Sequence, residues 1–316
     1  MKRDAFLRSV LGVAAGLVSG RRLGADPAQE TGSMPRRLLG ATGAEVGILG
    51  LGGHHVGLSG SERRARELVE AALTAGITFF DTAESYQNGR SEEWLGRALE
   101  GRRSRAFLMT KTYAPGDRSA ESAKRHLDGS LRRLRTDRLD LWQLHSIQSP
   151  EDVDRAFGTG GAMEFILEAK RQGIVRFVGV TGHVTPAAHL RALTYWDRGV
   201  RYDAVQLPLN PIDYHQRSFQ RQVLPELTRR RIGVIAMKTS ADGRLPRARL
   251  CTTEECLRFV WSLPIAVAVV GMERPQLVRV NAKTAKTPPM TEAERRALLD
   301  RLASRADLNL EWYKTS

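Results

Sequence analysis

Short apolar runs alternate with amphipathic segments along the chain from residue 37 onward. Each run is short enough for a buried strand, and together the runs cover residues 46–51, 77–80, 106–110, 139–144, 175–180, 204–207, 232–237 and 266–270. The segments between them repeat apolar residues at helical spacing, chiefly over residues 63–75, 91–99, 119–134, 162–172, 186–196, 223–230 and 253–261. Strands that alternate with helices predict a parallel sheet, and eight such units predict closure into a single (β/α)8 barrel.

Two of the helices carry capping signals at their starts. Ser91 is expected to cap the helix over residues 91–99, because a serine oxygen can accept a backbone N–H bond that the first turn leaves unmade. Thr291 with Glu294 three residues later is a capping-box pair, and it predicts a further helix over residues 291–303. That helix would be a C-terminal helical extension of the barrel.

The N-terminal residues differ from the rest of the chain. Lys2 and Arg3 precede Phe6 and Leu7, and a weakly apolar run over residues 10–18 follows. This run is too short to span a bilayer as a mature helix. It fits the apolar region of an export signal.

The opening resembles a twin-arginine signal, although its basic pair is Lys-Arg and two residues separate the pair from Phe-Leu. We therefore expect residues 1–30 to be a signal-like segment with its linker and residues 31–316 to be the barrel domain. The expected location is the periplasm, with no stable membrane insertion of the mature form. The alternative is a disordered N-terminus on a cytoplasmic protein.

Composition changes this picture little. A chain of 316 residues with 41% hydrophobic residues suits one large domain. The 49 Lys and Arg outnumber 35 Asp and Glu, and a net charge of +14 can recruit nucleic acid, an acidic surface or a phosphorylated cofactor. The basic residues are scattered and no nucleic-acid recognition motif accompanies them, so nucleic-acid binding is not expected.

Metal binding is not expected either. Cys251 and Cys256 form neither a zinc box nor a disulfide framework, and each is expected to be a small buried hydrophobe. Four histidines follow strands, but no carboxylate or cysteine completes a familiar metal site with them; they are His54, His55, His145 and His183. His54 and His55 are expected to line the substrate pocket.

Four polar groups are expected to meet at one mouth of the barrel. Asp81 follows the second strand, Lys111 the third and His145 the fourth, while Tyr86 lies in the loop after Asp81. Catalytic groups of such barrels lie at the C-terminal ends of strands. Each residue alone could be a turn, loop, surface or core residue, and their joint position is what indicates a site.

This set of groups suits the reduction of a carbonyl, which needs hydride at carbon and a proton at oxygen. Tyr86 can supply the proton, and a nearby ammonium, Lys111, lowers the pKa of a phenol. A carboxylate, Asp81, keeps the lysine charged and directed. His145 can orient the carbonyl oxygen and support the proton transfer.

With these four residues in place, the chain resembles the aldo-keto reductases over residues 37–285. The segments that carry it are RRLLGATGAEVGILGLGG, GITFFDTAESYQNGRSEEWLGRAL, LMTKT, RLDLWQLHSIQ, VGVTGH, VQLPLN and GVIAMK. The second is the most specific, since it holds Asp81 and Tyr86 at the family's spacing. The resemblance implies that Asp81, Tyr86, Lys111 and His145 form the catalytic tetrad of an active NAD(P)H-dependent oxidoreductase.

The resemblance also implies a nicotinamide cofactor bound at the strand ends without a Rossmann fingerprint. The implied contacts are Gly52 and Gly53 at the nicotinamide, Thr181, Gly182 and Gln206 at the carboxamide, Lys238 at the pyrophosphate, and Gly271, Glu273, Arg274 and Asn281 at the adenine side. Leu277 and Val280 stand where the family often has a basic residue and a glutamate. Arg274 or Arg279 could still reach a 2′-phosphate, so NADP is expected, with NAD as the alternative.

Two other functional classes compete with the enzyme. A barrel could hold the cofactor as a redox sensor or regulatory subunit with little turnover, and the intact tetrad argues against this. A hydrolase or lyase would need a metal or a carboxylate pair, and neither is indicated. The substrate is expected to be a small carbonyl or alcohol, selected by loops over residues 113–118, 148–161 and 210–219.

Overall fold

In the computed structural model, which describes residues 33–112 and 116–315, a closed parallel barrel forms the centre of the compact unit Met34–Ser316. The barrel order is β10-β3-β4-β5-β6-β7-β8-β9. Its strands are β3 Leu49–Gly52, β4 Phe79–Asp81, β5 Phe107–Lys111, β6 Leu139–Leu144, β7 Val175–Thr181, β8 Ala204–Pro208, β9 Gly233–Met237 and β10 Val267–Val270. Each is hydrogen-bonded in parallel to both neighbours. The predicted (β/α)8 barrel is confirmed.

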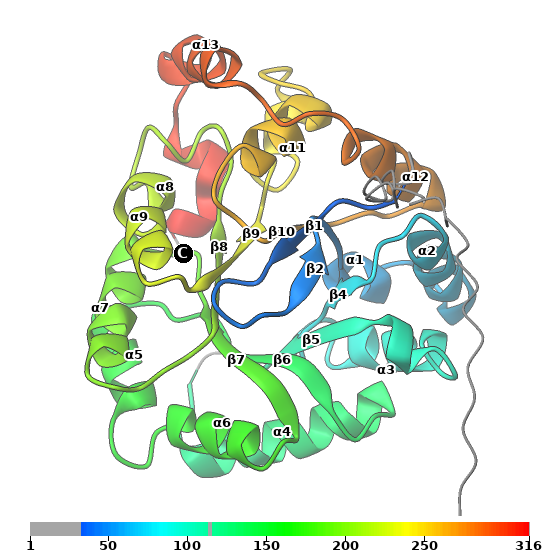
Figure 1. Cartoon of the computed structure of the whole chain (residues 1–316), viewed down its shortest axis with the longest axis vertical. Coiled ribbons are helices and arrows are strands. Elements are labelled where there is room, and N and C mark those ends of the chain that lie inside the picture. Colours follow the sequence, from blue (N-terminus) through cyan, green and yellow to red (C-terminus); the bar gives the residue numbers. More distant parts are fainter. Residues whose placement is uncertain (1–32, 113–115, 316) are drawn as a thin grey trace, which may run out of the picture. The chain divides into compact units, whose positions relative to one another are not determined.

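Helices surround the barrel and cover its outer face (Figure 1). They are α1 Gly53–Gly57, α2 Glu62–Thr74, α3 Arg90–Ala98, α4 Ala120–Leu134, α5 Pro150–Phe157, α6 Ala162–Arg171, α7 Pro186–Asp197, α8 Phe219–Gln222, α9 Leu224–Arg229, α10 Arg244–Arg247, α11 Thr253–Trp261, α12 Pro275–Thr284 and α13 Glu292–Ala303, with short 3-10 helices η1 Arg103–Arg105 and η2 Leu308–Lys314. The amphipathic segments predicted from the sequence therefore form the outer layer.

A hairpin that the sequence pattern did not predict closes one end of the barrel. β1 Arg36–Leu38 pairs antiparallel with β2 Glu45–Gly47. The single strand expected over residues 46–51 is thus wrong, because the chain leaves β2 at Gly47 and enters β3 at Leu49. Figure 1 shows the hairpin lying across the end of the barrel. Gly40 permits this approach, since a Cβ there would lie 2.4 Å from the backbone nitrogen of Gly233.

The core has two parts. Inside the barrel, apolar side chains from the strands pack with the hairpin, and Phe107 stacks between Phe79 and Phe177 at centroid distances of 4.9 and 6.3 Å. A larger cluster fills the space between the strands and the helices. Burying these layers of apolar side chains is the main force that holds the strand ends in place.

One predicted helix start is wrong and one is confirmed. α3 begins at Arg90 behind Gly89, whose φ of 87° suits glycine, so Ser91 lies inside the helix. The Ser91 hydroxyl instead donates to the carbonyl of Gly53 at 2.7 Å. At α13, Thr291 and Glu294 form the predicted capping box, and the C-terminal extension is present.

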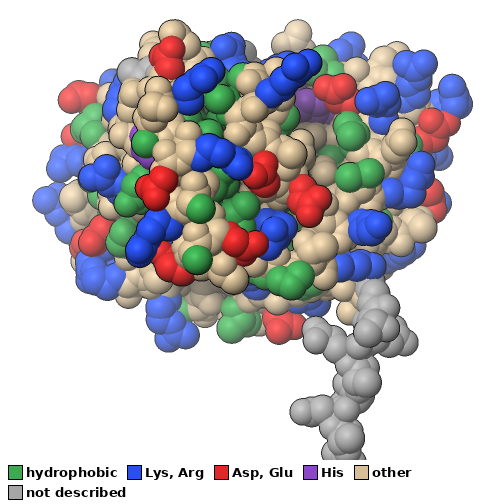
Figure 2. Space-filling view, turned by 90° about the horizontal axis from the view of Figure 1, so that it is seen from above, with side chains coloured by type: hydrophobic (Ala, Val, Ile, Leu, Met, Phe, Trp, Pro, Cys, Tyr) green, Lys and Arg blue, Asp and Glu red, His purple; other side chains and the backbone are tan. Residues whose placement is uncertain are grey.

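The face in Figure 2 carries basic and acidic side chains interspersed with one another. Within the described part of the chain, no helix is long and apolar enough to cross a membrane. The signal-like segment, residues 1–30, lies outside the described residues.

Candidate active site

Three of the four predicted catalytic groups meet around the Lys111 ammonium. Lys111 and Asp81 are the last residues of β5 and β4, and both are buried. The Lys111 Nζ forms an ion pair with Asp81 Oδ1, and it donates to the carbonyl of Thr82 at 2.7 Å and to the Tyr86 hydroxyl at 3.2 Å. The carboxylate and the carbonyl therefore direct the ammonium toward the phenol.

His145 completes the set from the neighbouring strand end, β6. Its ring meets the Tyr86 ring edge-on at a centroid distance of 6.0 Å, and its Nδ1 lies 3.4 Å from the Ser85 hydroxyl. The backbone at His145 is held on both sides, because its N–H donates to Thr112 Oγ1 at 3.1 Å and its carbonyl accepts from Arg118 at 2.8 Å. The sequence-predicted tetrad residues are thus brought together.

Sequence reasoning missed the pair that holds the His145 loop. Arg118 is buried and forms two hydrogen bonds with Asp152, at 2.9 and 2.7 Å. Asp152 also accepts from the backbone N–H of Gln148 at 3.1 Å. No local pattern pointed to this pair, since the partners lie on α5 and in the loop before α4.

Burial and neighbouring charges together set the protonation states of the site. Burial raises the pKa of Tyr86, and although Lys111 acts to lower it, the net shift is upward. Lys111 therefore acts on the phenol pKa in the expected direction, but burial, which the sequence does not give, has the larger effect. Burial also acts to lower the pKa of Lys111, but Asp81 and Tyr86 outweigh it, so the pKa is raised and the lysine stays charged.

The pKa of His145 lies well below its ordinary value. Burial is the main cause, and the positive charge of Lys111, together with His183 and Arg118, adds to it. The imidazole is therefore neutral at neutral pH, and it can offer one N–H donor to an oxygen in the mouth.

Gln206, on β8, reaches the tetrad directly. Its Nε2 donates to Asp81 Oδ2 at 3.0 Å, while its Oε1 is buried without a hydrogen-bond partner among the described residues. Thr181 pairs with Gln206 across β7 and β8 and is also buried. Gly182 follows, where a Cβ would lie 2.5 Å from the carbonyl of Ile147.

The end of β3 lies close to the end of β10. Gly52 ends β3, and Gly53 starts α1, where a Cβ would lie 2.3 Å from the Asp81 carbonyl. A Cβ on Gly271 would lie 2.2 Å from the His55 ring, and that ring is 3.8 Å from Glu273. The glycines therefore permit these close approaches.

The remaining predicted contacts lie on β9 and α12. Lys238, directly after β9, has a φ of 51° and its ammonium makes no ion pair with a carboxylate of the described chain. Burial lowers its pKa. Arg274 is exposed at the N-terminal cap of α12, and Asn281 is buried within this helix.

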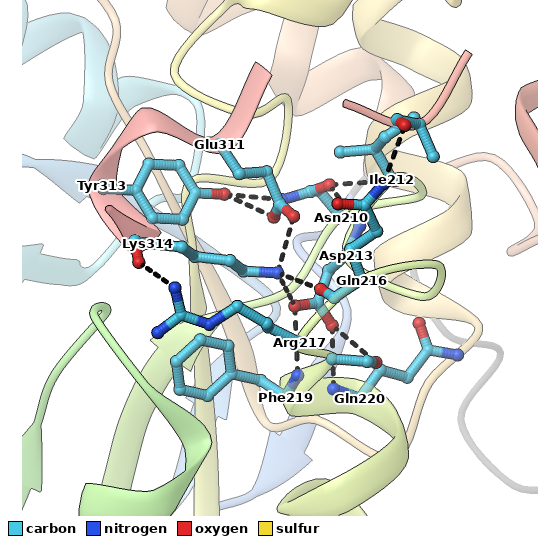
Figure 3. Close-up of polar contacts among 12 residues, drawn as sticks. Asn210, Ile212, Asp213, Gln216, Arg217, Phe219, Gln220, Glu311, Tyr313 and Lys314 are labelled. Carbon is cyan, nitrogen blue, oxygen red and sulfur yellow. Dashed lines mark hydrogen bonds and ion pairs between the residues drawn. The ribbon is translucent and has the colours of Figure 1, made fainter. Parts of the chain in front are cut away.

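The C-terminal helix η2 covers the loop after β8 through a buried polar network, which the sequence did not reveal (Figure 3). Lys314 donates to Asp213 at 2.7 Å and to Glu311 at 2.6 Å. Tyr313 and Asn210 donate to the other Glu311 oxygen at 2.7 and 3.1 Å. The network therefore holds η2 against the loop that follows β8.

Two contacts connect this segment with strand ends next to the tetrad. The carbonyl of Tyr313 lies 3.2 Å from His183 Nδ1, and the Tyr313 ring lies 4.7 Å from the Lys238 ammonium. The His54 ring also contacts the tetrad, lying edge-on to the Tyr86 ring at a centroid distance of 5.3 Å. Within the described ranges, no group of three or more His, Cys, Asp or Glu residues is arranged to hold a metal.

A closed parallel barrel with Tyr, Lys, Asp and His side chains gathered at its strand ends is the architecture of a barrel oxidoreductase. The model of the Aldo/keto reductase family matches residues 48–256. The chain therefore belongs to the aldo-keto reductases, a family of enzymes that interconvert carbonyls and alcohols.

Relatives agree with this assignment. The chain is 25% identical over 309 residues to the uncharacterized oxidoreductase YqkF of Bacillus subtilis, covering 84% of this chain and 95% of that protein. It is 33% identical over 219 residues to the L-galactose dehydrogenase of Arabidopsis thaliana, covering 66% of each. The holo form of the aldo-keto reductase AKR11C1 from Bacillus halodurans shares the fold, with a TM-score of 0.72, 24% identity, and coverage of 85% of this chain and 96% of that one.

Proposed function

We propose that this chain is an NAD(P)H-dependent enzyme that reduces an aldehyde or ketone to an alcohol, or runs the reverse reaction, with Tyr86 as the general acid and base. The observation that carries the proposal is the 3.2 Å contact between the Lys111 ammonium and the Tyr86 hydroxyl at the barrel mouth. A charged donor at that distance stabilises the phenolate that forms when Tyr86 gives up its proton.

The protonation states suit reduction. The raised pKa of Tyr86 keeps the phenol protonated at neutral pH, as a proton donor must be. Lys111 stays charged, and its ion pair with Asp81 and its bond to the Thr82 carbonyl fix the direction of its donors. Neutral His145 would donate a hydrogen bond to the carbonyl oxygen and hold it near the Tyr86 hydroxyl.

The residues near the tetrad fit a nicotinamide dinucleotide. When bound, this cofactor would supply or accept the hydride. The Gln206 Oε1, which has no hydrogen-bond partner in the described ranges, is a buried acceptor that a carboxamide N–H would satisfy, with Thr181 and Gly182 beside it. The Lys238 ammonium, which makes no ion pair with a carboxylate of the described residues, would suit the pyrophosphate. Gly52 and Gly53, at the end of β3, would lie beside the nicotinamide.

The adenine side would be held by Gly271, Glu273 and Arg274, which precede α12, and by Asn281 within this helix. This helix has no acidic residue in its first turn and no side-chain cap at Arg274. Its N-terminus and the exposed Arg274 would suit the 2′-phosphate, the group that NADP carries and NAD lacks.

A fluorescence titration tests the cofactor. NADPH is expected to quench the protein's tryptophan emission at lower concentration than NADH. The substitution Arg274→Ala is expected to weaken the binding of NADPH and to leave the binding of NADH unchanged. If neither dinucleotide binds at millimolar concentration, the oxidoreductase proposal fails. Steady reduction of a simple aldehyde would separate an enzyme from a cofactor-holding sensor with little turnover.

We also propose export, based on residues 1–30 alone. Mass spectrometry of the protein recovered from the cell envelope of a bacterial host is expected to lack the residues before about Asp26. An intact N-terminus found in the cytosol alone would contradict this proposal.

A further inference from the structure

Two cysteines face each other at the start of α11. Thr252 caps the helix and accepts from the N–H of Glu255, whose side chain accepts in return from the N–H of Thr252. In such a capping box, the residue before the cap packs against the fourth residue of the helix, usually as a pair of hydrophobes. Here those two positions are Cys251 and Cys256, so the box itself brings the two thiols together.

The thiols are in direct contact. Their sulfur atoms lie 3.1 Å apart, and both residues are buried, Cys256 fully and Cys251 with 6% of its surface exposed. A disulfide bond is about 2.05 Å long, so an approach of about 1 Å would form it. Four residues separate the two cysteines, and the capping box already fixes the backbone of this segment. The disulfide could therefore form without refolding of the segment.

We propose that Cys251 and Cys256 are a redox-active pair, a modification site in which a small peroxide converts the two thiols into a reversible intramolecular disulfide. The Cys251 thiolate attacks the peroxide, forming a sulfenic acid and releasing water or an alcohol. The Cys256 sulfur then displaces the sulfenic oxygen as water and forms the S–S bond. Overall, two thiols are oxidised by two electrons and one peroxide is reduced.

Cys251 is the thiol that reacts first. It is the more exposed of the two, and its small exposed area favours a small oxidant over a large one. A hydrogen bond from Cys256 lowers the pKa of Cys251, whereas the same bond and burial raise the pKa of Cys256. The reactive thiolate therefore has its resolving thiol in contact with it, the arrangement of a peroxide-sensing pair.

A disulfide between Cys251 and Cys256 would affect the structure because of where the two residues lie. Cys251 ends the connection from β9 that includes Lys238 and α10, and Cys256 lies inside α11. Arg301 of α13 donates to Glu255 at 2.7 Å and to the carbonyl of Leu250 at 3.4 Å, on either side of Cys251 in sequence. A disulfide would add a covalent tie between the end of this connection and the helix.

Peptide mass spectrometry tests the proposal on the full-length protein. Cleavage after Arg249 and Arg258 leaves both cysteines in the peptide LCTTEECLR, residues 250–258. After treatment with a small excess of hydrogen peroxide, denaturation and alkylation, we expect this peptide to be lighter than the dithiol form by two hydrogen atoms and to carry no alkyl group. Dithiothreitol is expected to restore two alkylated cysteines.

Cys251→Ser and Cys256→Ser are the matched controls, and circular dichroism checks that each is folded. Neither can form the light peptide, and Cys256→Ser is expected to accumulate the sulfenic acid, detectable with dimedone. Full alkylation of both cysteines after peroxide treatment would overturn the proposal. So would oxygen addition without S–S bond formation, or a disulfide that joins two chains on a non-reducing gel.

Discussion

Gln206 and Asp81 are hydrogen-bonded at 3.0 Å across the barrel, from Nε2 to Oδ2, while the other Asp81 oxygen pairs with Lys111. One carboxylate therefore connects a residue proposed for cofactor binding with the group that acts on Tyr86. Substituting Gln206 should affect both functions.

Gln206→Met is the first prediction. It removes a hydrogen bond to a buried carboxylate and the proposed carboxamide acceptor, and each such loss costs about 1–3 kcal/mol. We expect the Kd for NADPH to rise about tenfold or more, with a fall in kcat as well. Isothermal titration and steady-state kinetics measure the two effects.

Gln172→Met is the control, since Gln172 is exposed at the end of α6, just before the start of β7 and so at the end of the barrel away from the C-terminal strand ends. This variant should leave both the Kd for NADPH and kcat unchanged. Unaltered cofactor affinity in Gln206→Met would show that this glutamine acts only within the protein.

The second prediction concerns pH. Alcohol oxidation needs the phenolate of Tyr86, and Lys111 opposes the upward pKa shift that burial causes. Removing the ammonium in Lys111→Met should raise the phenol pKa further, so the alkaline rise of the oxidation rate should move to higher pH. A stopped-flow pH profile tests this, and an unshifted profile would mean that Lys111 does not act on Tyr86.

The third prediction is acid destabilisation by His189. This residue is buried, its Nε2 has no partner among the described residues, and burial lowers its pKa to about 4. The unfolded chain, with a pKa of about 6.5, binds the proton more readily between these values. Stability is therefore full above pH 6.5 and is lost as pH falls toward 4, by about 3 kcal/mol.

Urea unfolding across this pH range measures the effect. His189→Leu should have a shallower dependence on pH between 4 and 6.5 than the parent, because its site has no proton to bind. Parallel curves for the two proteins would rule out His189 as the source of the slope.

The fourth prediction concerns the C-terminal network. Lys314→Met would leave Asp213 and Glu311 buried without their cation, and breaking a buried ion pair in this way costs about 3–5 kcal/mol. Lys286→Met removes a lysine that is exposed on the surface and should change stability by less than about 0.5 kcal/mol. Equal midpoints in urea for the two variants would contradict the structural role of the network.

The sequence predicted the barrel well because strands and helices of this fold leave local periodic signals. The strand over residues 139–144 and the capping box at Thr291 were correct for that reason. The hairpin β1–β2 was missed because its second strand runs almost directly into β3, so the apolar run looked continuous. Ser91 was misplaced because Gly89, in a left-handed conformation, starts the helix earlier.

The candidate site was predictable where a polar or titratable residue directly follows a predicted strand. Asp81, Lys111 and His145 stand there, and the (β/α)8 topology alone brings them to one mouth. Arg118 with Asp152, and Lys314 with Asp213, were not predictable. Their partners are far apart in sequence, and only the folded backbone places them together. The net pKa shift of Tyr86 depends on burial, which residue spacing does not give.

The central claim is that the Tyr86 hydroxyl supplies the proton, and Tyr86→Phe tests it most directly. The variant removes one oxygen and keeps the ring that packs beside His54 and His145. The measurement is the single-turnover rate of aldehyde reduction at saturating NADPH, with NADPH affinity determined on the same sample. We predict a rate lower by about 10²- to 10⁴-fold with nearly unchanged affinity. Reduction at close to the parental rate would contradict the account.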